Sequence, residues 1–132
     1  MEHRHWMEPT SLRAVTDRGL AILARTPHKL SYFHCPVPLS ASDFLPDYFA
    51  PLADLYPALS SHGCELYLGL IHFNDLEGTK TRIAQAQKLA PEFGVATECG
   101  LGRTPPEQIE ELMRLSAELS GPVVLGGGGG ER

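Results

Sequence analysis

The stretch that decides the fold is ELYLGLIHFND, residues 65–75. Its first seven residues are almost continuously apolar, which is typical of a parallel strand covered on both faces and not of a half-exposed antiparallel strand. The apolar run then gives way to His72, Asn74 and Asp75. The stretch therefore predicts a buried strand that ends in side chains able to carry chemistry.

Helices and strands are predicted to alternate on both sides of this stretch. Helices are expected over about residues 10–26, 48–61, 76–89 and 104–120, and strands over residues 30–33, 65–71 and 94–96. Strands that alternate with helices of this length indicate right-handed crossovers and a parallel sheet. The sequence thus predicts an α/β domain over residues 1–125, followed by a flexible glycine-rich tail over residues 126–132.

Local residue chemistry refines this outline. Pro36 is expected to end the first strand, because proline cannot donate to a sheet ladder, and residues 39–47 are expected to form a loop. Thr104 and Glu107 form a capping-box pattern, with proline at the first helical position. Met113 is assigned to the buried apolar face of the last helix.

Composition and charge exclude several classes of protein. The chain has 132 residues and a net charge of −5, and its 11 Lys and Arg are scattered, so nucleic acid and anionic membranes are not expected partners. The sequence contains neither an apolar run of membrane-spanning length nor a secretory signal at its start. Three cysteines are too few for a disulfide scaffold, which favours a reducing compartment and a cytoplasmic location.

All three predicted strands end in reactive side chains. They end in His34 and Cys35, in His72, Asn74 and Asp75, and in Thr97, Glu98 and Cys99, while His3 and His5 precede the first helix. Ligands of parallel α/β sheets meet the carboxyl ends of the strands. Thiolate and imidazole donors in such a ring suit a zinc site. An acid–base cluster, with Glu98 or His72 moving protons, is equally open.

Each candidate also has a structural interpretation. Cys99 could be a small buried residue, Glu98 could pair with Arg103, and His34 could be a satisfied polar strand end. Asp75 could cap the helix that follows it. The pair His62 and Cys64 has metal-ligand spacing, but it precedes a strand, at the face of the sheet that serves stability, and is not expected to bind metal.

Several segments resemble one known family. The strand–turn–helix GVATECGLGRTPPEQIEELMRL (residues 94–115) is similar to the last strand, loop and helix of the cobalamin-independent methionine synthase barrel, and more closely to the methionine-synthase-II-like proteins of the uroporphyrinogen decarboxylase/methionine synthase superfamily. ELYLGLIHFNDLEGTKTRIAQAQ (65–87), FHCPVP with DYFAPLADL (33–38 and 47–55) and HRHWMEP (3–9) resemble the preceding units. Together these segments cover about residues 3–123.

The resemblance implies part of a (β/α)8 TIM barrel, about three C-terminal βα units, and a zinc site at the carboxyl face. Cys99 matches the family's last metal-ligating cysteine. The family's His-x-Cys pair has no match and is expected upstream of Met1, and Glu98 replaces an Asp of the family motif. Of the family's site residues, only Cys99 is matched. From their positions at the strand ends and in the following turn, we expect His72 and Glu98 to be catalytic, and Arg103, Asn74, Asp75 and His34 to bind substrate.

Three functions are weighed on these grounds. The first is a barrel fragment whose ancestral activity is zinc-dependent methyl or alkyl transfer to a thiol, inactive alone, with a small-molecule thiol or methyl donor as its partner. The second is a non-catalytic α/β module that dimerises or pairs with another barrel half, because three βα units leave two open sheet edges and a complete barrel needs about 250 residues. The third is a cofactor-free lyase or decarboxylase.

Overall fold

The computed structural model describes residues 5–121, and the predicted Gly-rich tail and the last residues of the predicted domain lie outside this range. The elements in chain order are α1 (Arg13–Arg25), β1 (Tyr32–Pro36), the short 3-10 helices η1 (Leu39–Phe44) and η2 (Asp47–Phe49), α2 (Leu52–Ser61), β2 (Glu65–Ile71), α3 (Leu76–Gln87), β3 (Gly94–Thr97), the 3-10 helix η3 (Leu101–Arg103) and α4 (Pro106–Leu119). The predicted alternation of helices and strands is confirmed. Within residues 5–121, no helix is long and apolar enough to cross a membrane.

The three strands form one parallel sheet in the order β1-β2-β3, so the α/β class and the parallel pairing are confirmed. His34 pairs with Tyr67, and Tyr67 pairs with Gly94, which places β2 at the centre. The β2–β3 register shifts between Leu68 and Ile71. Among residues 5–121 neither β1 nor β3 has a second strand partner, so each presents one open edge.

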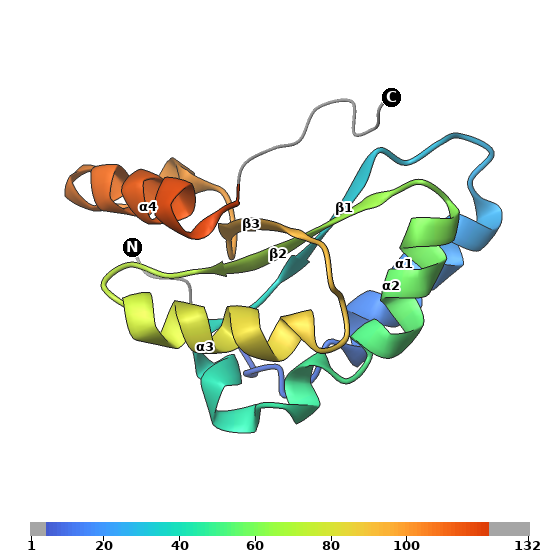
Figure 1. Cartoon of the computed structure of the whole chain (residues 1–132), viewed down its shortest axis with the longest axis horizontal. Helices are drawn as coiled ribbons and strands as arrows, with labels where there is room; N and C mark the ends of the chain where they lie inside the picture. Colours follow the sequence, from blue (N-terminus) through green and yellow to red (C-terminus); the bar gives the residue numbers. More distant parts are fainter. Residues whose placement is uncertain (1–4, 122–132) are drawn as a thin grey trace.

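Helices cover the sheet from several sides. α1 packs on α2, both α2 and α3 contact β2, and α4 contacts β3 and β2. In Figure 1, α3 runs below β2 and β3 while α4 lies above them. The main core combines Leu66 and Leu68 of β2 with Leu52 and Leu55 of α2, all nearly or fully buried. A smaller apolar cluster joins Ile71 at the end of β2 to Leu112 and Leu115 of α4.

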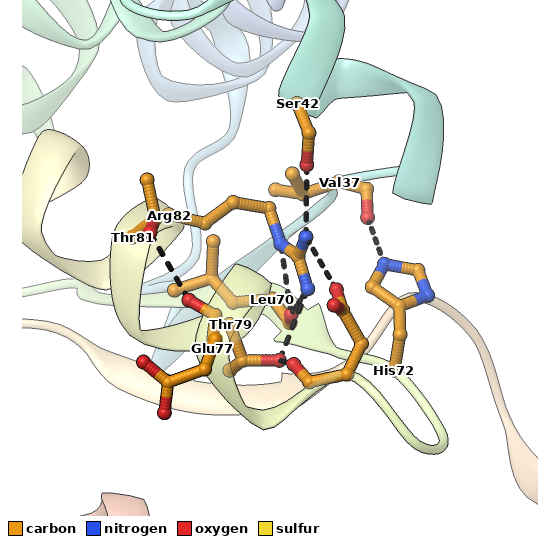
Figure 2. Close-up of polar contacts among 9 residues, drawn as sticks. Val37, Ser42, Leu70, His72, Glu77, Thr79, Thr81 and Arg82 are labelled. Atoms are coloured by element: carbon orange, nitrogen blue, oxygen red, sulfur yellow. Dashed lines mark hydrogen bonds and ion pairs between the residues drawn. The ribbon is translucent and has the colours of Figure 1, made fainter.

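A fully buried arginine connects α3 to β2 and η1. Arg82 donates two hydrogen bonds to the carbonyl oxygen of Leu70, at 3.2 and 2.9 Å, and one to Ser42 Oγ at 3.0 Å. It also donates to Thr79 Oγ1 (Figure 2). The Arg82 guanidinium forms an ion pair of 2.9 Å with Asp75. Burial lowers the pKa of Arg82, an effect that the Asp75 carboxylate opposes. The guanidinium is therefore held by four partners, which lie on β2, on η1 and at the start of α3.

Some local predictions are wrong. β1 ends at Pro36, as expected, but it also includes His34 and Cys35, beyond the predicted end of the strand at Phe33. Residues 39–44 form η1 where a loop was expected. α4 begins at Pro106 without a side-chain cap, so Thr104 does not form a capping box. Met113 is 59% exposed and does not belong to the core. Asp75 precedes α3 but makes no side-chain cap, since its carboxylate pairs with Arg82.

Candidate functional site

The carboxyl ends of the parallel strands bring several predicted site residues together. His34 of β1 reaches across β2, and its Nε2 lies 3.1 Å from the carbonyl oxygen of Thr97 at the end of β3. Because a carbonyl oxygen can only accept, Nε2 carries the proton and donates. The interpretation of His34 as a satisfied polar group is confirmed, and this bond joins the two outer strands of the sheet.

Gly69 makes this crossing possible. A Cβ built at Gly69 would lie 2.7 Å from the Thr97 carbonyl oxygen, 2.7 Å from Glu98 Cα and 3.1 Å from His34 Nε2. Real Cβ atoms essentially never approach backbone atoms so closely, so only glycine fits here without a shift. Sequence reasoning missed this residue. The available signal was a lone glycine inside an apolar strand, which often marks a close approach of another backbone.

His72 lies just beyond the end of β2 and is partly buried. Its Nε2 lies 2.8 Å from the carbonyl oxygen of Val37 and therefore donates to it (Figure 2). Burial lowers the pKa of His72, although the bond to Val37 and the nearby carboxylates act in the opposite direction. The ring is thus held in its neutral form, with the lone pair on Nδ1 as its proton acceptor.

Glu98 follows β3 and has an almost fully enclosed side chain, 11% exposed. Its Oε2 is buried and accepts no hydrogen bond, and the closest ionisable partner described is His5, whose Nε2 lies 3.5 Å away. His5 Nδ1 lies 3.2 Å from the carboxylate of Glu8. The segment before α1 therefore lies against the end of β3, with Trp6 fully exposed to solvent beside this contact.

Two cavities meet at this place. The first, which we call the apolar cavity, has a volume of about 820 Å³ and is lined by His5, Tyr32, His34, Pro36, Tyr67, Ala96, Thr97, Glu98, Cys99 and Gly100. The second, which we call the acidic cavity, has a volume of about 1090 Å³ and includes the carboxylates of Glu8, Asp43, Asp75 and Glu98 together with His72 in its wall. Their common wall consists of His5, Thr97, Glu98 and Cys99.

The three cysteines differ in exposure. Cys99 is exposed and lines both cavities, so its interpretation as a small buried residue is wrong. Cys35 is buried in the main core, and burial raises the pKa of its thiol to about 12. Cys64 is also buried, and burial raises the pKa of its thiol. Only Cys99 has the access that a reactive thiol needs.

In the part of the chain that the structure describes, the donors do not gather into a complete metal site. Among residues 5–121, no group of three or more His, Cys, Asp or Glu is close enough to hold a metal ion. A catalytic zinc needs about three protein ligands. The residues described therefore do not fit a zinc ion by themselves, and His3 lies outside the described range.

The remaining predicted substrate-binding residues do not line one common cavity. Asp75 lines the acidic cavity, but Arg82 occupies its carboxylate. Asn74 has a positive φ of 54° and donates its backbone N–H to Glu111 Oε1 at 3.2 Å. Asn74 and Arg103 line neither of the two cavities. The structure thus brings His34, Glu98 and Cys99 together around the apolar cavity and places His72 and Asp75 in the acidic one.

No family model, curated protein or solved structure matches the chain. The resemblance to methionine-synthase-like proteins therefore remains a prediction made on the residues quoted above.

Proposed function

We propose that the chain is a three-unit segment of a methionine-synthase-like βα barrel, which acts in alkyl transfer to a thiol only when further βα units complete the barrel. One observation carries the proposal: polar side chains on or just after all three parallel strands lie towards the carboxyl ends of the sheet. Among residues 5–121, both edge strands of this sheet lack an outer partner. Barrel enzymes place their active sites at this edge.

The residues described have separate tasks in such a site. Cys99 is the accessible thiol at the mouth of both cavities and is the residue we assign as one metal ligand. Zinc would lower the pKa of a bound thiol, and its remaining ligands would have to come from the completing units. His72, kept neutral by burial, can accept the proton of the incoming thiol at Nδ1.

The test measures zinc in the chain alone and in a complex with a barrel piece that supplies the missing units. The chain alone should bind zinc well below one equivalent and catalyse no alkylation. The complex should hold about one zinc, and Cys99→Ser should lower zinc affinity roughly tenfold or more. The matched control is Cys64→Ser. Cys64 directly precedes β2, at the amino end of the strand and away from Cys99, so its loss should leave zinc affinity unchanged.

Two outcomes would overturn this proposal. One is that the chain and the completing piece do not associate in native mass spectrometry, which would show that the open edges are not barrel seams. The other is that Cys99→Ser retains full zinc affinity in the complex, since Cys99 would then not be a ligand.

A second function is favoured by the exposed side of β1. Tyr32 is 63% exposed on this edge strand, and it packs edge-to-face on Tyr67 with ring centroids 5.8 Å apart. This supports a non-catalytic module that pairs with a second chain along β1. Sedimentation of Tyr32→Asp tests it, because a charge here should dissociate such a pair, and a chain that is monomeric at all concentrations would exclude it.

A further inference from the structure

We propose that the apolar cavity binds an organic ammonium ion, with the apolar group of the ligand against Tyr32 and Tyr67 and its charged nitrogen at Glu98. This inference does not depend on the proposed function, because it concerns binding by the chain as it stands. Three features of the cavity favour such a ligand: its walls are largely apolar, one carboxylate oxygen is buried without a hydrogen bond, and the neighbouring cavity is acidic.

The walls of the apolar cavity favour a flat or aliphatic group. Tyr32 and Tyr67 stand edge-to-face at one end, and Pro36 and Ala96 add further apolar surface. His34 also lines the cavity, but its Nε2–H is already used by the Thr97 carbonyl oxygen. The apolar cavity has a volume of about 820 Å³, which is large enough for a small organic molecule. An apolar cavity with few polar groups at one place is the usual form of a small-molecule site.

Glu98 is the only carboxylate in this cavity among the residues described. Its Oε2 is shielded from solvent and accepts no hydrogen bond. A buried charge without a hydrogen-bonding partner is costly, so a donor that carries positive charge gains more here than it would at an exposed carboxylate. His5 lies 3.5 Å from Oε2, but it supplies charge only when it is protonated. An ammonium ion supplies charge and several donors at once.

The neighbouring acidic cavity points to the same sign of charge. It adds Glu8 and Asp43, whereas the charge of Asp75 is balanced by Arg82. Hydrogen bonds from Ser40 and His5 lower the pKa of Glu8, which keeps it ionised. Among residues 5–121, neither Lys nor Arg lines either cavity. The electrostatic potential at the shared wall is therefore negative, and a negative potential attracts cations and disfavours anions.

The experiment uses the full chain and four probes titrated near neutral pH by calorimetry and by proton NMR of the tyrosine rings. The probes are 2-phenylethylammonium, its uncharged analogue 2-phenylethanol, the anion 3-phenylpropanoate and the small cation ethylammonium. 2-Phenylethylammonium should bind and should shift the ring signals of Tyr32 and Tyr67. The alcohol and ethylammonium should each bind roughly tenfold more weakly, because each lacks one of the two contacts, and the anion should not bind.

Glu98→Gln keeps the size of the side chain and should weaken 2-phenylethylammonium binding roughly tenfold or more. The matched control is Glu107→Gln, which removes the same charge from the exposed first turn of α4, outside both cavities, and should leave affinity unchanged.

The proposal is overturned if the alcohol binds as tightly as the ammonium, if Glu98→Gln has no effect, or if 2-phenylethylammonium shows no saturable binding up to millimolar concentration. None of these results bears on zinc in the completed barrel, so failure of this proposal and failure of the proposed function can be told apart.

Discussion

Gly69 and Glu98 touch backbone to backbone, because the position of a Cβ on Gly69 lies only 2.7 Å from the Cα of Glu98. This contact lets the end of β3 close over β2. It also lets the His34 ring reach the Thr97 carbonyl oxygen. The geometry of the shared wall between the two cavities thus depends on the absence of one methyl group in the central strand.

Gly69→Ala should therefore destabilise the protein by about 1–3 kcal/mol, since backbone atoms and not a flexible side chain must give way. Urea unfolding measures the change, and proton NMR should show loss of the hydrogen bond from the His34 ring. Gly100→Ala is the control, because a Cβ there would meet no atom within 4 Å, and it should change the free energy of unfolding by less than about 0.5 kcal/mol. Equal effects in both variants would contradict the close contact.

Arg82→Met should lower the free energy of unfolding by about 3–5 kcal/mol, because removing one partner leaves the buried polar groups around it unsatisfied. Those groups include the Asp75 carboxylate and the Leu70 carbonyl oxygen. Arg114→Met removes an exposed ion pair with Glu118 on α4 and should cost less than about 1 kcal/mol. Chemical unfolding of both variants gives the comparison, and a loss for Arg82→Met as small as that of the control would show that the buried network contributes little.

The thiols should react in a fixed order with an aromatic disulfide reagent at about pH 8. Cys99 is exposed and should react at once, whereas Cys35 should react only as the protein unfolds, because burial raises the pKa of its thiol to about 12. Cys99→Ser should abolish the fast phase, and Cys64→Ser should preserve it. A fast phase that survives in Cys99→Ser would mean that a second thiol is accessible.

Acid should destabilise the protein through His72. Its pKa is lowered in the folded state, mainly by burial, so the unfolded chain binds a proton more readily. The stability that the neutral ring contributes is complete above the ordinary histidine pKa and is lost as pH falls through it towards the folded pKa. His72→Gln should therefore flatten the fall in the urea midpoint between about pH 8 and about pH 5.5. The control is His28→Gln, a substitution at an exposed position. An unchanged slope in His72→Gln would exclude this role.

The order of elements could be predicted from the sequence because apolar periodicity and strand length carry that information locally. The predicted start of the last helix at Thr104 is wrong because two prolines follow that residue. Proline excludes the preceding residue from the helical region, so the pair Pro105 and Pro106 delays α4 until Pro106. The apolar pattern of the last helix places Met113 on its buried face, but the buried stripe of α4 is narrow and leaves Met113 outside.

The candidate site was predictable only as a set of strand ends. Parallel pairing requires those ends to lie along one edge, and Glu98 and Cys99 do lie there. His34 lies within β1 and not at its end, and only its side chain reaches the end of β3. Their contacts depend on tertiary structure that no local pattern encodes. The approach of His5 to Glu98 joins two segments that are far apart in the sequence, and the crossing of His34 over Gly69 depends on the register of three strands.

Trp6 is the chain's one tryptophan, and its side chain is fully exposed next to the contact between His5 and Glu98. Unfolding leaves an already solvated indole in nearly the same surroundings, so its emission is a poor monitor of denaturation. Because of the same exposed position, the emission of Trp6 should respond strongly when a partner chain binds there. A blue shift on mixing would signal that a partner chain has covered the segment before α1, and stopped-flow measurement of that shift would give the association rate without any added label.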